Sequence, residues 1–117
     1  MNLLAVFIGG GLGSLARYGI SCSIPKHMTN FPLATFLSNL LACILLAFIV
    51  KLSFTEKIDS RIVLLAATGF CGGFSTFSTF SLENIKLIQD GMVGMALLNA
   101  IVSIVVCGLA MHFILSK

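Results

Sequence analysis

The chain has 117 residues, of which 58% are hydrophobic and 9% are charged, and its formal net charge is +3. Soluble domains carry about 25% charged and about 45–50% apolar residues, so this composition excludes a soluble enzyme and a disulfide-stapled secreted domain. The basic residues form no run, which also excludes a nucleic-acid-binding protein, and we expect no nucleic-acid partner. The length allows a single domain, residues 1–117.

The charged residues divide the chain into long uncharged stretches. A helix needs about 20 apolar residues to cross a bilayer core, and the first stretch reaches this length only if Arg17 lies inside the helix or at its edge. The uncharged stretches cover residues 2–16, 27–50, 62–82 and 91–116. The sequence therefore predicts an all-α membrane protein, not an enzyme. Its four transmembrane helices are expected at about 2–24, 32–52, 62–88 and 92–115.

The first predicted helix is rich in glycine. Gly9 and Gly13 are four residues apart, a pattern that lets two membrane helices approach closely. The chain start lacks the basic segment of a cleavable signal peptide, so we expect this helix to remain in the mature protein. Arg17 is the only basic residue well inside a predicted span. It either extends to the membrane interface or supplies a positive potential to a vestibule where an anion collects.

Polar side chains recur at close spacing on three of the four predicted helices. They are Thr35, Ser38 and Asn39 in the second helix, Ser75, Thr76, Ser78, Thr79 and Ser81 in the third, and Asn99, Ser103 and Cys107 in the fourth. In the second and fourth helices the spacing places these residues on one face. The three stripes predict a polar seam. This seam is either a hydrated path or a set of hydrogen bonds that hold the helices together.

The third predicted helix is interrupted by glycines. Gly72 and Gly73 are adjacent within its apolar run. The helix is expected to end at a turn, for which Asp90–Gly91 is the signal. A broken helix within a membrane leaves backbone groups that protein, water or ions must satisfy. The glycine pair therefore predicts either an ion site or a simple kink.

The chemistry of the polar seam favours an anion over a cation. No Asp or Glu lies inside a central apolar run, so the carboxylate ring of a cation channel is missing. Glu83 is the only acid near the end of such a run. The remaining groups are hydroxyls, amides and the positive edges of aromatic rings. Phe77 and Phe80 share one face of the third helix at i and i+3. They are either part of an anion path or ordinary core residues.

The four cysteines form no CxxC pair. We expect all of them to be small buried hydrophobic residues rather than disulfides or metal ligands. They are Cys22, Cys43, Cys71 and Cys107.

The positive charges at the two ends of the predicted spans are nearly balanced. With four spans, one side collects Lys51, Lys57, Arg61 and Lys117, and the other has Lys26 and Lys86, with Arg17 if it faces that way. Membrane proteins keep their positively charged loops on the cytoplasmic side, and a larger difference in Lys and Arg between the two sides is needed to set one orientation. We therefore hypothesise that the chain inserts into the membrane in both orientations.

Three segments resemble the Fluc family of fluoride channels, also called CrcB. They are GFCGGFSTFSTFS at 69–81 with Glu83 after it, GGGLGSLARY at 9–18, and TFLSNLLA at 35–42. Chain length and the four-helix organisation are also similar, so the resemblance spans nearly the whole chain. The GGFSTFSTFS element is the specific part, and a glycine run alone would not be.

The resemblance implies a fluoride-selective channel that exports fluoride passively and relieves fluoride toxicity. It places the chain in the bacterial plasma membrane as a multi-pass protein surrounded by membrane lipid. It also implies an antiparallel, dual-topology homodimer with two pores, each lined by both subunits. A sodium ion would be a structural cofactor at the dimer interface.

The same resemblance assigns roles to individual residues. The fluoride pathway would comprise Phe77, Phe80, Asn39, Ser78, Thr79 and Ser103. Arg17 would be the vestibule arginine, and the backbone carbonyls of Gly72 and Ser75 would bind the sodium ion. Ser75 departs from the threonine that the family often has there, a change that a backbone ligand tolerates. Cys107 would be only a weak hydrogen-bonding group on the fourth helix.

Two other functions compete with a fluoride channel. A small dual-topology multidrug exporter has the same size and helix count, but it needs a buried glutamate in its first helix, and residues 2–16 contain no acid. A non-transporting membrane scaffold would use the glycine and hydroxyl residues only for packing. A proton-coupled fluoride carrier is a close variant of the channel, and its flux would depend on a pH gradient.

Overall fold

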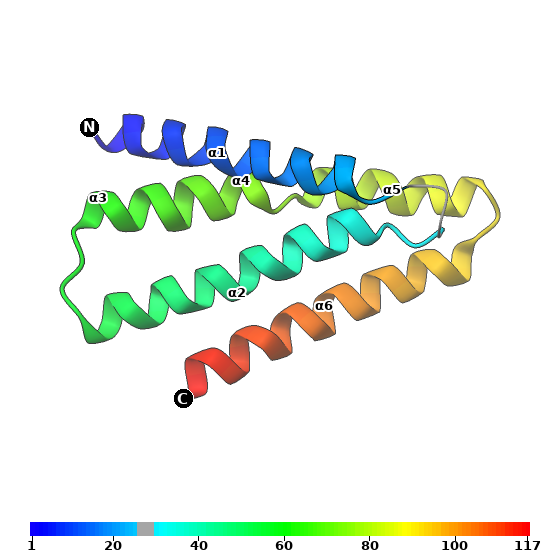
Figure 1. The fold of residues 1–117 in the computed structure, drawn as a ribbon. Coiled ribbons are helices and arrows are strands. Elements are labelled where there is room, and N and C mark those ends of the chain that lie inside the picture. The colour runs from blue at the N-terminus through cyan, green and yellow to red at the C-terminus, as the bar shows by residue number, and fades with distance from the viewer. Residues whose placement is uncertain (26–29) are drawn as a thin grey trace.

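The computed structural model describes residues 1–25 and 30–117, and these form a bundle of long helices (Figure 1). Four helices are long and apolar enough to cross a membrane, which confirms the predicted four-helix membrane protein. The elements are α1 (Asn2–Ser23), α2 (Leu33–Thr55), α3 (Ser60–Val63), the π-helical segment η1 (Leu64–Cys71), α4 (Gly72–Phe74), α5 (Phe77–Gln89) and α6 (Val93–Ser116). The segment that crosses third is built from α3, η1, α4 and α5.

Two residues with extended backbone separate α4 from α5. Ser75 has φ −84° and ψ 156°, and Thr76 has φ −153° and ψ 123°. Gly72 and Gly73 lie within α4, so the prediction that this pair interrupts the helix is wrong in position. Both glycines keep helical geometry, and Gly73 allows a close backbone contact with α1. Figure 1 places the irregular stretch near the middle of the bundle.

Glycines bring the backbone of α1 into contact with η1 and α4. A Cβ at Gly9 would overlap the carbonyl oxygen of Leu65, and one at Gly13 would overlap that of Phe70. From the opposite side, a Cβ at Gly73 would overlap the carbonyl oxygen of Gly10. The predicted close approach at the Gly9–Gly13 spacing is therefore confirmed, and its partner is the third crossing segment.

The turn between α5 and α6 closes at Gly91. This residue has φ +81°, in the left-handed region that favours glycine. The Met92 amide donates to the Leu87 carbonyl at 2.8 Å, and the Gly91 amide donates to the Ile88 carbonyl at 3.0 Å. These two bonds define a Schellman motif, which ends α5 and satisfies its last carbonyls. The turn predicted at Asp90–Gly91 is therefore confirmed.

The described part of the chain has small and polar residues inside and large apolar residues outside. Its most fully buried larger side chains are Asn99 and Ser38, each 1% exposed. Large apolar side chains such as Phe7, Leu15 and Ile104 are exposed. A single chain in water would not leave so much apolar surface uncovered. Lipid or a second protein chain must therefore cover it.

The four cysteines are free thiols with different exposure. Cys71 is buried, while Cys43 and Cys107 are half-buried. Cys22 is exposed near the end of α1, so the expectation that all four are buried is wrong for this residue in the single chain. Its helix position faces away from η1 and α4 rather than toward them.

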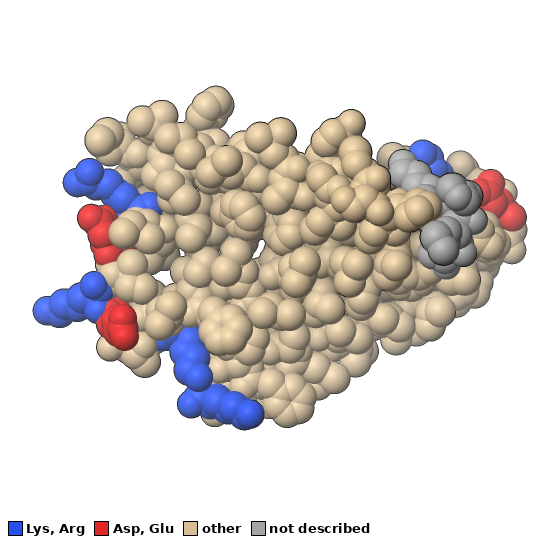
Figure 2. Space-filling view, viewed as in Figure 1, with Lys and Arg blue, Asp and Glu red and all other residues tan. Residues whose placement is uncertain are grey.

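Charged side chains gather at the two ends of the bundle (Figure 2). The end that holds both chain termini in Figure 1 carries most of the Lys and Arg seen in Figure 2. Lys26, which was assigned to the other end, lies outside the described residues. The long middle of the visible face has no charged atoms, as expected for a surface in contact with hydrocarbon.

Candidate functional site

The candidate site is built around the extended residues Ser75 and Thr76. Asn39, on α2, binds both backbone groups of Thr76: its Oδ1 accepts from the Thr76 amide at 2.8 Å, and its Nδ2 donates to the Thr76 carbonyl at 3.4 Å. An Asn side chain offers the same donor and acceptor as a peptide group. Asn39 therefore takes the place of the Gly72 carbonyl, the acceptor that the Thr76 amide would use in a continuous helix, and it links α2 to the start of α5.

The Thr76 side chain organises the first turn of α5. Its Oγ1 accepts from the Thr79 amide at 3.2 Å, which makes Thr76 the N-cap of this helix. The same oxygen is 3.2 Å from Ser78 Oγ and 3.2 Å from Thr79 Oγ1. The structure thus joins the predicted pathway residues Asn39, Ser78 and Thr79 through one residue, Thr76.

Arg17 lies against the carboxyl end of α4. Its Nε donates to the Gly73 carbonyl at 3.1 Å, and the side chain is half-buried. In a continuous α-helix this carbonyl would accept from the amide of residue 77. Because the helix stops at Phe74, the guanidinium takes over that role. The guanidinium is thus held against the third crossing segment, and its role at a vestibule stays a prediction.

A cavity of about 460 Å³ opens beside Arg17. It lies between the carboxyl end of α1, the amino end of α2 and α5. Its lining includes Arg17, Thr35, Thr79, Glu83 and Lys86. Thr35 Oγ1 donates to Glu83 Oε1 at 2.7 Å across this region. The cavity thus offers hydrogen-bond donors to an anion, from a guanidinium, an ammonium and hydroxyls, beside the carboxylates of Glu83 and Asp90.

Two carbonyls near Ser75 lack the donors that a regular helix would give them. The Thr76 amide, which would pair with the Gly72 carbonyl, donates to Asn39 instead. The Thr79 amide, which would pair with the Ser75 carbonyl, donates to the Thr76 hydroxyl. The Ser75 hydroxyl itself donates to the Cys71 carbonyl at 2.8 Å. Side chains thus divert the helical donors from the two carbonyls that were predicted to bind a cation.

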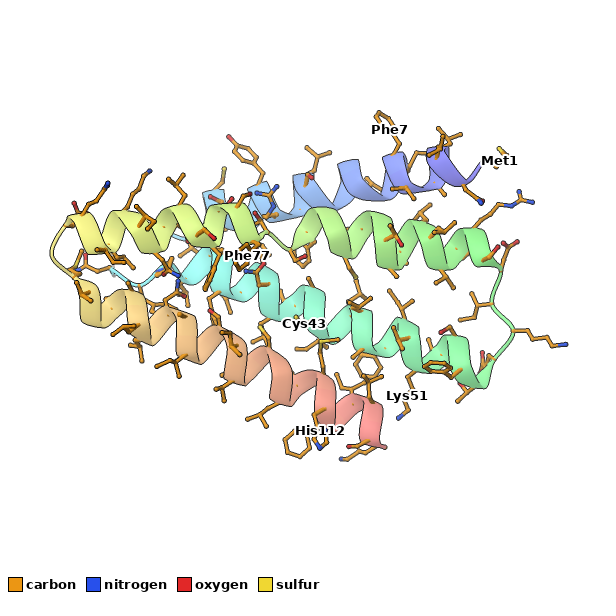
Figure 3. The ribbon with its side chains drawn as sticks, turned by 180° about the vertical axis from the view of Figure 1, so that it is seen from behind. Met1, Phe7, Cys43, Lys51, Phe77 and His112 are labelled. Atoms are coloured by element: carbon orange, nitrogen blue, oxygen red, sulfur yellow. The ribbon has the colours of Figure 1, made fainter. Side chains whose placement is uncertain are left out.

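Phe77 lies at the connection between α4 and α5 (Figure 3). Its side chain is 80% exposed, whereas Phe80 is half-buried. The two ring centroids are 5.8 Å apart at an interplanar angle of 33°. The structure therefore places both rings together on one face of α5, and the more exposed ring borders the extended residues.

Ser103 belongs to a different polar cluster. Its Oγ donates to Asn99 Oδ1 at 3.2 Å, and Asn99 Nδ2 donates to Asn84 Oδ1 at 2.7 Å. Within the described chain, no direct hydrogen bond joins these residues to Asn39 or Thr76. Sequence reasoning missed Asn84 because it stands alone in a run of apolar and charged residues. Its spacing of four residues from Phe80 is the signal that could have identified it.

Comparison with known proteins finds a matching family model and similar named proteins. The family model described as CrcB-like protein, Camphor Resistance (CrcB), matches residues 4–114. A protein of Hydrogenobaculum sp. (strain Y04AAS1) named fluoride-specific ion channel FluC is 50% identical over 93 residues, which cover 78% of this chain and 75% of that protein. A protein of the same name from Serratia proteamaculans (strain 568) is 43% identical over 104 residues, which cover 88% of this chain and 82% of that protein.

Proposed function

We propose that this chain, which belongs to the CrcB family, is a fluoride-selective ion channel of the bacterial plasma membrane. It lets fluoride leave the cell passively and so relieves fluoride toxicity. The observation that carries this proposal is the high identity to relatives named fluoride-specific ion channels, across most of both chains. The four spanning helices place it in the membrane as a multi-pass protein.

The groups around Ser75 and Thr76 suit an anion that is strongly hydrated. A selective pore must replace the water around such an ion with other donors, and it must do so without holding the ion too tightly. Asn39, Ser78 and Thr79 provide amide and hydroxyl groups, while Phe77 and Phe80 provide weakly positive ring edges. Ser103 adds a hydroxyl group on α6.

Arg17 raises the anion concentration near this pathway. Its guanidinium is held at Gly73, beside the cavity that Thr79 and Thr35 also line. A fixed positive charge in a partly enclosed hollow attracts anions from the adjoining water. Because the charge is bonded to a carbonyl, it contributes a potential at the vestibule without forming a tight ion pair with fluoride.

The working unit is an antiparallel homodimer in which both subunits line each of two pores. Phe77 supports this assembly, because an aromatic ring that is 80% exposed in the single chain needs a cover. The near balance of positive charge between the two ends supports insertion in both orientations. Cross-linking between two copies that carry a cysteine in place of Phe77, which lies near the middle of the bundle (Figure 3), would test whether this face of α5 meets a second copy.

A sodium ion fits the backbone between α4 and α5 as a structural cofactor. The carbonyls of Gly72 and Ser75 are hard oxygen ligands whose helical donors are used elsewhere. Within the described residues no group of three or more His, Cys, Asp or Glu could hold a metal, so the carbonyls are the donors that this region offers. When bound at the dimer interface, the ion would supply a positive charge between the two subunits.

Fluoride efflux from liposomes tests the proposed function. Purified protein is reconstituted into liposomes loaded with fluoride or with chloride, and valinomycin removes the membrane potential. We expect fast fluoride release and negligible chloride release, with no dependence on a pH gradient. Fluoride flux that requires a pH gradient would instead indicate the proton-coupled carrier. No fluoride release from a folded dimer would overturn the proposal and favour the exporter or the scaffold.

Two phenylalanines of equal exposure make a matched pair for this assay. Phe77 is 80% exposed and Phe7 is 78% exposed, but Phe7 lies near the start of α1, far along the bundle from the α4–α5 connection (Figure 3). Phe77→Ile should abolish most of the fluoride flux, and Phe7→Ile should leave it unchanged. Equal flux in both variants would remove Phe77 from the pathway.

A further inference from the structure

A chain of hydrogen bonds runs in one direction from α6 to α5. It begins at Ser103, whose hydroxyl donates to the side-chain carbonyl of Asn99 at 3.2 Å. The amide nitrogen of Asn99 then donates to the side-chain carbonyl of Asn84 at 2.7 Å. Asn99 is 1% exposed and Ser103 is buried, so water does not compete for the bond between them.

The direction of this chain decides which group can still donate to an anion. Ser103 has one hydroxyl proton, and it is used on Asn99. Asn84 accepts through its oxygen, and the bonds of this cluster leave both of its amide hydrogens uncommitted. The group of this hydrogen-bond series that can still donate is therefore the amide of Asn84, not the hydroxyl of Ser103.

Asn84 continues the face of α5 that carries the two pathway phenylalanines. It follows Phe77 by seven residues and Phe80 by four, so all three lie on one side of the helix. One helical turn, about 6 Å along the axis, separates Asn84 from Phe80. Asn84 is half-buried, as Phe80 is, so an ion that leaves the ring of Phe80 would next meet the amide of Asn84.

We propose that Asn84 is the hydrogen-bond donor that receives fluoride after Phe80, and that Asn99 and Ser103 act on the ion only by holding Asn84. This inference rests on the proposed fluoride channel and names a further residue of its pathway. Aligned hydrogen bonds polarise one another in a buried setting. The two upstream bonds therefore make the amide hydrogens of Asn84 better donors and keep its oxygen turned away from the anion.

Substitution of Asn84 by aspartate tests this role with little change of shape. Asn84→Asp keeps an oxygen that can accept from Asn99, but it replaces the amide donor with a second oxygen that repels fluoride. We expect at least about a tenfold loss of fluoride efflux, because hydrogen bonds to charged groups are among the stronger ones. Asn2→Asp, the matched control, makes the same chemical change at the exposed start of α1 and should leave efflux unchanged. Ser103→Ala removes only an upstream bond, so it should lower efflux no more than about threefold.

One further measurement and one further variant separate an effect on folding from an effect on the pathway. Size-exclusion chromatography shows whether each variant keeps the oligomeric state of the unsubstituted protein. If Asn84→Asp does not fold, Asn84→Ala decides the question, since it removes the donor without adding a charge and should also lower efflux about tenfold.

The outcomes distinguish this inference from the proposed function. No fluoride release by the unsubstituted protein would overturn both. Normal release by the unsubstituted protein together with near-normal release by a folded Asn84→Asp or Asn84→Ala variant would overturn only the role of Asn84. An equal or larger loss in Ser103→Ala would also overturn it, because Ser103 would then be the donor. A loss confined to the Asn84 variants supports it.

Discussion

Alanine at Gly13 should separate α1 from the third crossing segment. The new Cβ would overlap the Phe70 carbonyl oxygen and would lie only 2.8 Å from the Phe74 amide nitrogen. Both neighbours are backbone atoms, which cannot rotate away as a side chain would. The two helices must therefore move apart along the contact that places Arg17 against Gly73.

The expected loss of stability follows from two opposing effects. Overpacking a tight contact costs about 1–3 kcal/mol, and replacing glycine by alanine inside a helix contributes about 0.5–1 kcal/mol of stability. The difference is a destabilisation of up to about 2.5 kcal/mol for Gly13→Ala, with a central value of about 1 kcal/mol. Gly11 is the matched control, since it is in the same helix and a Cβ there meets no atom within 4 Å. Gly11→Ala should be neutral or slightly stabilising.

Unfolding in mixed micelles of a mild detergent and SDS measures this difference. Energy transfer between dyes on the two chain ends would follow the transition, and repeats at several protein concentrations would separate subunit dissociation from unfolding. We expect the midpoint of Gly13→Ala to fall clearly below that of Gly11→Ala. Coincident midpoints, or a more stable Gly13→Ala, would refute the close backbone contact as a source of stability.

Three further substitutions test the other contacts. Asn39→Leu should destabilise the chain by about 1–3 kcal/mol, because it removes the acceptor of the part-buried Thr76 amide; hydrogen exchange at this amide should accelerate. Arg17→Gln should slow fluoride efflux and lower stability by about 1–3 kcal/mol, because it frees the Gly73 carbonyl and removes a positive charge. Gly91→Ala should cost about 1–2 kcal/mol, measured by the same unfolding assay, since its φ is +81°.

Matched controls exist for the last two changes. Arg61 is an exposed basic residue at the end of the bundle, so Arg61→Gln should leave both efflux and stability unchanged. A Cβ at Gly94 meets no atom within 4 Å and this residue lies in α6, so Gly94→Ala should not destabilise. If either control behaves like its test variant, then the loss reflects charge or composition in general rather than the named contact.

Much of the fold was predictable because hydrophobic length is a local property. Four uncharged stretches predict four spans, and each stretch contains most of one spanning segment found in the described residues. The Asp90–Gly91 turn was also visible, since a left-handed backbone position favours glycine. The spacing of Gly9 and Gly13 indicated a close helix contact, although not the identity of its partner.

The position of the extended backbone was not predictable from glycine content. Gly72 and Gly73 are the weakest helix formers in their segment, yet both are helical. The helix ends two residues later, at Ser75 and Thr76, where Asn39 and the Thr76 side chain replace the lost helical bonds. A partner 37 residues away decides this, and local preference contains no information about it.

The sequence by itself determined the class of the protein, the number of spans and the residue types of the seam. Only the tertiary structure decided which polar groups meet: Arg17 with Gly73, Asn39 with Thr76, and Asn84 with Asn99. The physical reason is that a helical period shows which residues share a face, but not how that helix is rotated against its neighbours. Many of these partners are also backbone groups, which every residue carries and no sequence pattern distinguishes.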